Sequence, residues 1–167
     1  MIQADNEVET AMLSRPHAGW SDFELDGMTS GYGLSYLDDI AFEWLDQAIR
    51  GLETRKPFCV EGELEPGYFL CTVSLFNCHI VVEDGCSDDD DSDVTFFVSP
   101  TNMMEFCRNL YHDVSKNIDE WVCFYWGKDS KDPDVPKWRN ELEGKLTRLK
   151  ELIDETESKR FDGYRWL

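Results

Sequence analysis

The chain is short of positive charge. Its 167 residues contain 16 Lys and Arg against 35 Asp and Glu, which gives a formal net charge of −19 at pH 7. A surface of that sign repels phosphate backbones and anionic membranes, so direct binding to nucleic acid or to a membrane is not expected. The partner that this charge favours is a basic protein.

Long apolar runs and targeting signals are also missing. No stretch approaches the roughly 18 consecutive apolar residues that a membrane-spanning helix needs. Residues 1–20 lack the basic start and apolar core of a secretory signal. We therefore expect a cytoplasmic protein whose six cysteines are reduced and serve as small buried apolar side chains.

Signatures of catalysis and metal binding are absent as well. The sequence has no C-x-x-C pair, no glycine-rich phosphate loop, and neither an H-E-x-x-H nor a G-x-S-x-G motif. The acidic run that starts at Asp88 fails as a calcium loop, because Asp93 and Ser99 stand where Gly and Glu are required. We expect no enzyme activity, no cofactor and no specific metal site; weak binding of a divalent cation by the acidic run stays open.

The apolar pattern predicts an α+β fold, with a mostly antiparallel meander of about five strands packed by two or three helices. Residues 1–32 lack a sustained period and are interpreted as a loop-rich arm with one short strand near Phe23. Residues 33–160 are interpreted as one domain, and residues 161–167 as an aromatic tail that either packs back or joins an interface. The expected elements are a helix over 34–52 capped by Ser35, strands over 58–64, 68–76, 79–82 and 93–98, a helix over 103–114 capped by Ser99 ahead of Pro100, a strand over 121–126 and a helix over 138–153.

Negative charge is concentrated in the first part of the chain. Residues 1–93 hold 21 of the 35 acidic residues and 4 of the 16 basic ones. Two segments stand out, the polar face of the helix over 34–52 and the loop before the strand over 93–98, and we predict that both contact a basic partner. The predicted partner-binding residues are Asp38, Asp39, Glu43, Asp46, Asp88, Asp89, Asp90, Asp91 and Asp93.

The middle of the chain carries a family resemblance. Strands over 58–64, 69–76 and 79–82 are followed by Val94-Thr-Phe-Phe-Val-Ser-Pro100, which leads into the helix over 103–114. This order resembles immunity proteins of bacterial polymorphic-toxin and contact-dependent inhibition systems. The resemblance implies a protein that neutralises a basic toxin, for example a nuclease, and it assigns no individual site residue. The alternatives are a DNA mimic that occupies nucleic-acid-binding proteins and a small enzyme; a homodimer is also open.

Overall fold

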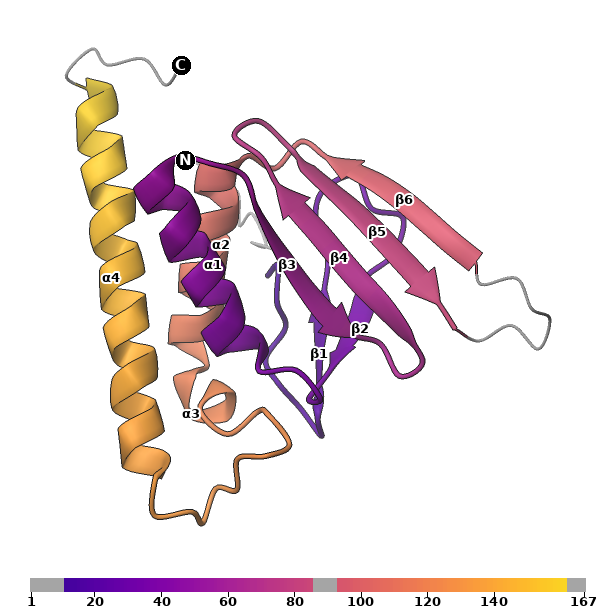
Figure 1. The fold of residues 1–167 in the computed structure, drawn as a ribbon, viewed down its shortest axis with the longest axis vertical. Helices are drawn as coiled ribbons and strands as arrows, with labels where there is room; N and C mark the ends of the chain where they lie inside the picture. Colours follow the sequence, from indigo (N-terminus) through magenta and orange to yellow (C-terminus); the bar gives the residue numbers. More distant parts are fainter. Residues whose placement is uncertain (1–10, 86–92, 162–167) are drawn as a thin grey trace, which may run out of the picture.

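The computed structural model describes residues 11–85 and 93–161 of the chain (Figure 1). Within these ranges it contains a four-stranded sheet, a two-stranded hairpin and four helices, and all strand pairs are antiparallel. The α+β class predicted from the sequence is confirmed.

The four-stranded sheet is a simple meander, in which the strands lie side by side in chain order. Each strand of the run between residues 58 and 99 was predicted, because apolar residues alternate there and turn residues separate the runs. The alternation buries one face of the sheet and exposes the other, as the pattern of β3 shows most clearly. The strands are β3 (Phe58–Glu63), β4 (Gly67–Val73), β5 (Cys78–Asp84) and β6 (Asp93–Ser99).

The hairpin of β1 (Trp20–Phe23) and β2 (Tyr32–Ser35) covers the buried face of the sheet and lies behind it in Figure 1. The rings of Phe23 and Phe69 are 4.6 Å apart between centroids, and Tyr32 contacts Phe97 at 6.0 Å. The segment interpreted as a loop-rich arm therefore supplies core residues, since Phe23 is fully buried.

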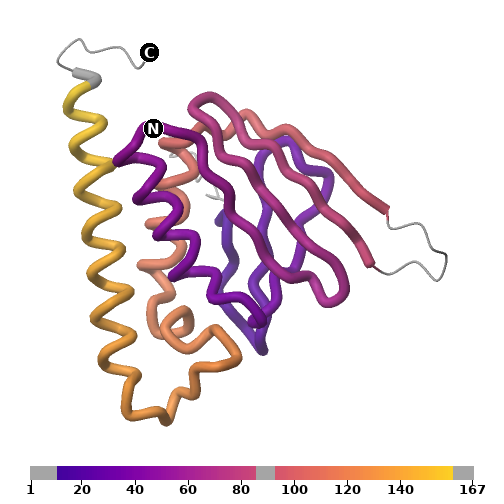
Figure 2. Tube along the Cα trace, viewed as in Figure 1, coloured from indigo at the N-terminus to yellow at the C-terminus, as the bar shows by residue number. Residues whose placement is uncertain are grey.

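The helices lie beside the sheet at its β3 edge (Figure 2). Helix α1 packs on β3, and α4 packs across α1 and α2. Trp44 of α1 stacks on Phe69 with an interplanar angle of 18°, and Phe106 of α2 meets Phe58 edge to face. The helices are α1 (Ile40–Thr54), α2 (Met103–Lys116), α3 (Ile118–Trp121) and α4 (Val135–Phe161).

A glycine in the last turn of α1 has a packing reason. A Cβ atom on Gly51 would lie 2.2 Å from Cδ1 of Phe58, so any side chain there would displace a buried ring. Helix α1 thus accepts a residue that disfavours helix in order to lie close to β3.

Three local predictions are wrong. The first helix begins at Ile40, because residues 32–35 pair with β1 as a strand, and Ser35 is therefore not its cap. Helix α2 is capped by Asn102, whose side chain and that of Glu105 form a reciprocal capping box, in place of Ser99. The apolar run over 121–126, predicted as a strand, is the end of α3 and the turn after it.

Candidate functional site

Four carboxylates gather where the start of α1 meets the outer side of β3. Asp38 lies two residues before the first residue of α1, and Glu43 lies in the first turn of the helix. Glu61 and Glu63 project from the other face of β3 than the buried Phe58 and Val60, so they point away from the core. We call Asp38, Glu43, Glu61 and Glu63 the carboxylate cluster.

Like charges and partial burial oppose ionisation in this cluster. Burial raises the pKa of Asp38, a backbone hydrogen bond from Glu63 partly offsets this, and the charges of Glu63 and Glu61 raise the pKa further. Burial raises the pKa of Glu43 too, and the nearby carboxylates add to the effect. The hydroxyl of Tyr68 donates to Glu63, and this hydrogen bond raises the pKa of the tyrosine.

The charged groups with the largest effect on the pKa of Asp38 and Glu43 are other carboxylates. The ionised cluster therefore costs the folded state free energy, which a positive charge from outside the chain would recover. A group of like charges that is maintained at a cost in stability is typical of binding sites.

Two of the predicted contact residues have partners inside the chain. Asp39 accepts a hydrogen bond of 2.5 Å from Nζ of Lys128, and this Nζ lies 3.3 Å from the centre of the Phe42 ring. Asp46 forms an ion pair with Lys145 of α4. The polar face of α1 is thus partly directed at α4 and is not open along its whole length.

The remaining predicted residues belong to the loop before β6. Asp93 is the first residue of β6 and is exposed. Asp88, Asp89, Asp90 and Asp91 lie outside the described residues. Among the described predicted residues, Asp38, Asp39 and Asp46 all lie close enough to Glu43 for their charges to raise its pKa, and of these three Asp38 belongs to the carboxylate cluster.

The sequence prediction missed Glu61, Glu63 and Tyr68. A signal for the two glutamates was present, because they occupy alternate positions of a strand whose other face is apolar. Their proximity to Asp38 was not predictable from local pattern, since it depends on how α1 packs on β3.

Two exposed aromatic residues, Tyr36 and Trp126, belong to segments near the carboxylate cluster. Tyr36 is 39% exposed and lies two residues before Asp38. Its backbone oxygen accepts a hydrogen bond of 2.9 Å from the backbone of Trp126, whose side chain is 63% exposed. Aromatic faces next to carboxylates are suited to Lys and Arg side chains, which bind both.

The outer face of the four-stranded sheet continues from the cluster as an exposed surface. Its rows run across the strands: Glu61 pairs with Leu70 and Leu70 with Val81, which pairs with Phe96 of β6. Exposure is greatest at β6, where Phe96 is 72% exposed. We call this surface the open face, and it consists of Cys59, Glu61, Glu63, Tyr68, Leu70, Thr72, His79, Val81, Glu83, Val94, Phe96 and Val98.

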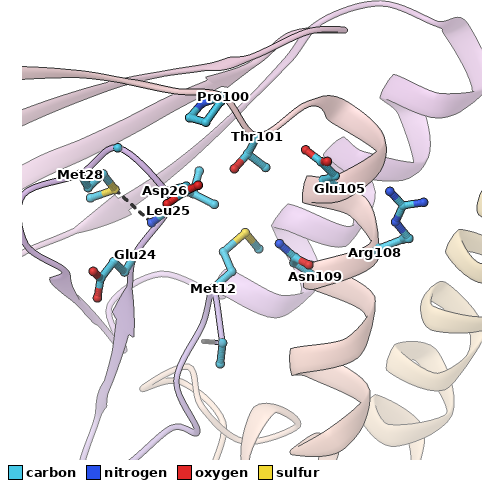
Figure 3. A pocket seen from close by; sticks show the side chains of 12 residues that line it. Met12, Glu24, Leu25, Asp26, Met28, Pro100, Thr101, Glu105, Arg108 and Asn109 are labelled. Atoms are coloured by element: carbon cyan, nitrogen blue, oxygen red, sulfur yellow. Dashed lines mark hydrogen bonds between the residues drawn. The ribbon is translucent and has the colours of Figure 1, made fainter. Parts of the chain in front are cut away.

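A cavity of the described residues lies elsewhere, between α2 and the N-terminal segment (Figure 3). It has a volume of about 470 Å³, and its polar lining includes Glu24, Glu105 and Arg108. Glu105 closes the capping box of α2, and Arg108 forms an ion pair with Glu157. Neither histidine nor cysteine lines this cavity, and its ionisable side chains are Glu24, Asp26, Glu105 and Arg108.

The thiols follow the sequence prediction in part. Cys71, Cys78 and Cys107 are buried, whereas Cys59 is exposed on the open face, which contradicts the prediction for that residue. A hydrogen bond with Cys78, together with burial, raises the pKa of Cys71, and burial raises that of Cys107. Thiols of this kind are weak nucleophiles. The described residues contain no group of three or more His, Cys, Asp or Glu side chains placed to hold a metal ion.

Comparison with known protein families, curated proteins and solved structures finds no match for this chain. None of the helices in residues 11–85 and 93–161 has the length and apolar character needed to cross a membrane. Function is therefore inferred from the carboxylate cluster and its surroundings.

Proposed function

We propose that this protein binds a basic protein through the carboxylate cluster and inhibits it, as an immunity protein neutralises a basic toxin such as a nuclease. The cytoplasmic setting expected from the sequence is part of this proposal. The observation that carries it is the cluster itself, in which Asp38 and Glu43 are partly buried and the charges that act most strongly on them are those of further carboxylates.

The surroundings of the cluster support a cationic protein rather than a small ion. Tyr68 is exposed and donates to Glu63, and exposed Tyr36 lies two residues before Asp38. Tyrosine is enriched at the centres of protein interfaces. Arg and Lys side chains of a partner would contact ring faces and carboxylates at once. Steering by the net charge of −19 would accelerate association.

The proposal is tested with two variants that lose equal charge. One carries Asp38→Asn, Glu43→Gln, Glu61→Gln and Glu63→Gln. The control carries the corresponding amide substitutions at four exposed carboxylates outside the cluster, Asp22, Glu24, Asp134 and Glu155. The wild type and both variants are immobilised, and proteins of the source organism are captured at low salt and eluted with a salt gradient.

A single basic protein that binds the wild type and the control but not the cluster variant, and whose purified activity the wild type inhibits, is the expected result. Capture of many nucleic-acid-binding proteins would instead identify a DNA mimic. Equal binding by the two variants would show that the cluster is not the contact surface, whatever protein is captured.

A further inference from the structure

We propose that the partner contributes an extended segment of alternating basic and apolar residues, which adds to the free edge of β6 as a fifth strand of the sheet. This inference rests on the proposed function and names the element of the basic partner that docks. It concerns the opposite edge of the sheet from the carboxylate cluster, since the strand order runs from β3 to β6.

Strand β6 has a free edge over residues 93–97, whereas Gly27 lies against the backbone of Val98 and Ser99 at the end of the strand. In the described part of the chain it pairs with β5 alone, and the register is continuous from Asp93 to Ser99 without a bulge. Its sequence, DVTFFVS, has neither Lys nor Pro, the residues that commonly protect an edge strand from further pairing. Such an edge is a template for another strand.

The side chains of β6 provide the apolar part of the site. Val94, Phe96 and Val98 lie on the open face and are 47%, 72% and 57% exposed. On an added strand, every second side chain would lie beside this row and continue it outward from Leu70 and Val81. The incoming segment should therefore have an apolar residue at every second position, on the side that lies beside Val94, Phe96 and Val98.

Charge decides between a basic segment and a second copy of this chain. The four strands of the sheet contain Glu61, Glu63, Glu83, Asp84 and Asp93 and neither Lys nor Arg. Four consecutive aspartates, residues 88–91, come shortly before β6 in the sequence. A second copy would bring a further net charge of −19 to this sheet, whereas a segment with Lys or Arg at alternate positions complements it.

The test uses four synthetic ten-residue peptides and the full chain. The peptides are an alternating Lys–Val sequence, its isosteric Lys–Thr counterpart, a Glu–Val sequence, and a Lys–Val sequence methylated on the nitrogen of every second residue. Affinities are measured by fluorescence anisotropy for the wild type, for Phe96→Ser and for the control Phe76→Ser. Phe76 is 74% exposed but lies between β4 and β5, away from the free edge.

The Lys–Val peptide is expected to bind the wild type about tenfold more tightly than Lys–Thr, and Phe96→Ser alone should remove this difference. Nitrogen methylation should weaken binding about tenfold or more, because it removes the backbone donors of one edge of the strand. Equal affinity for Lys–Val and Glu–Val, or no effect of methylation, would overturn the proposal. So would sedimentation of the wild type alone as a dimer that Phe96→Ser dissociates, since the occupant would then be a second copy.

Failure here is distinguishable from failure of the proposed function. The amide variant of the carboxylate cluster keeps β6 intact, and Phe96→Ser keeps every carboxylate. Suppose that the amide variant no longer captures the partner, while Phe96→Ser binds the four peptides with the same affinities as the wild type. The proposed function would then stand, and strand addition would be refuted.

Discussion

The enclosed ion pair between Asp39 and Lys128 gives the sharpest prediction of stability. Their side chains are 18% and 12% exposed, and Oδ1 of Asp39 is buried without a hydrogen-bond partner. Removal of one member of a buried pair costs about 3–5 kcal/mol, and the residual exposure places Lys128→Met at the lower end, about 3 kcal/mol. For a chain of this length the melting temperature should fall by about 6–12 °C.

The stability that Lys128→Met removes should depend on pH, because it depends on the ionisation of Asp39. Burial raises the pKa of Asp39 above 3.8, while Lys128 acts to lower it. Because the folded pKa is raised, the contribution of Asp39 is fully present below pH 3.8 and is lost as the pH rises through the folded value. Without Lys128 the pKa rises further, so the cost of Lys128→Met should be largest at pH 7 and shrink towards about pH 4 as Asp39 takes up a proton.

The assay is urea unfolding followed by tryptophan fluorescence at both pH values. Lys145→Met is the matched control, since its partner Asp46 is 57% exposed and the loss should be about 1 kcal/mol or less. The double variant Asp39→Asn with Lys128→Met should regain most of the stability, because it leaves no unpaired charge. The reasoning is refuted if the two lysine variants lose the same free energy, or if the loss at Lys128 does not change with pH.

Two further predictions use the same unfolding assay. Gly51→Ala should destabilise the protein by about 1–3 kcal/mol, because the new methyl group clashes with Phe58. Gly144→Ala in α4 should stabilise it by about 1 kcal/mol, because nothing lies within 4 Å of the new methyl group. Equal effects of the two substitutions would exclude packing as the cause. Asp38→Asn should stabilise the fold by ~0.5 kcal/mol at neutral pH, because the raised pKa makes ionisation of Asp38 unfavourable, and the gain should vanish below pH 3.8. A loss of stability in Asp38→Asn would mean that the ionised carboxylate is favourable where it lies.

The secondary structure was predictable where a local pattern had one interpretation. The four strands between residues 58 and 99 have clear periods and were predicted close to their observed bounds. Helix α4 was predicted from its apolar stripe over 138–153, but it begins at Val135 and continues to Phe161. The run from Trp121 to Trp126 has no period, and a short apolar run fits a strand or a helix equally well. Tertiary packing decides the conformation of this run, since the rings of Trp121 and Phe124 contact each other and both belong to the core.

The candidate site was only half predictable for a related reason. Polar positions on the first helix were identified from its period, but the period does not say which of them face α4. Asp39 and Asp46 pair with lysines 89 and 99 residues away in the chain. Glu61 and Glu63 join Asp38 only because α1 packs against β3.

These contacts show how basic residues of the second part of the sequence pair with acidic residues of the first part. Lys128, Lys145 and Arg148 come from the more balanced second part, and all three pair with carboxylates at or on α1. The helical side of the molecule is thereby neutralised to a large extent from within, whereas the strands of the sheet have acidic residues and neither Lys nor Arg. The carboxylates of the sheet thus have no Lys or Arg of its own strands to balance them, and their charge would steer a cationic protein to the surface where both proposed contacts lie.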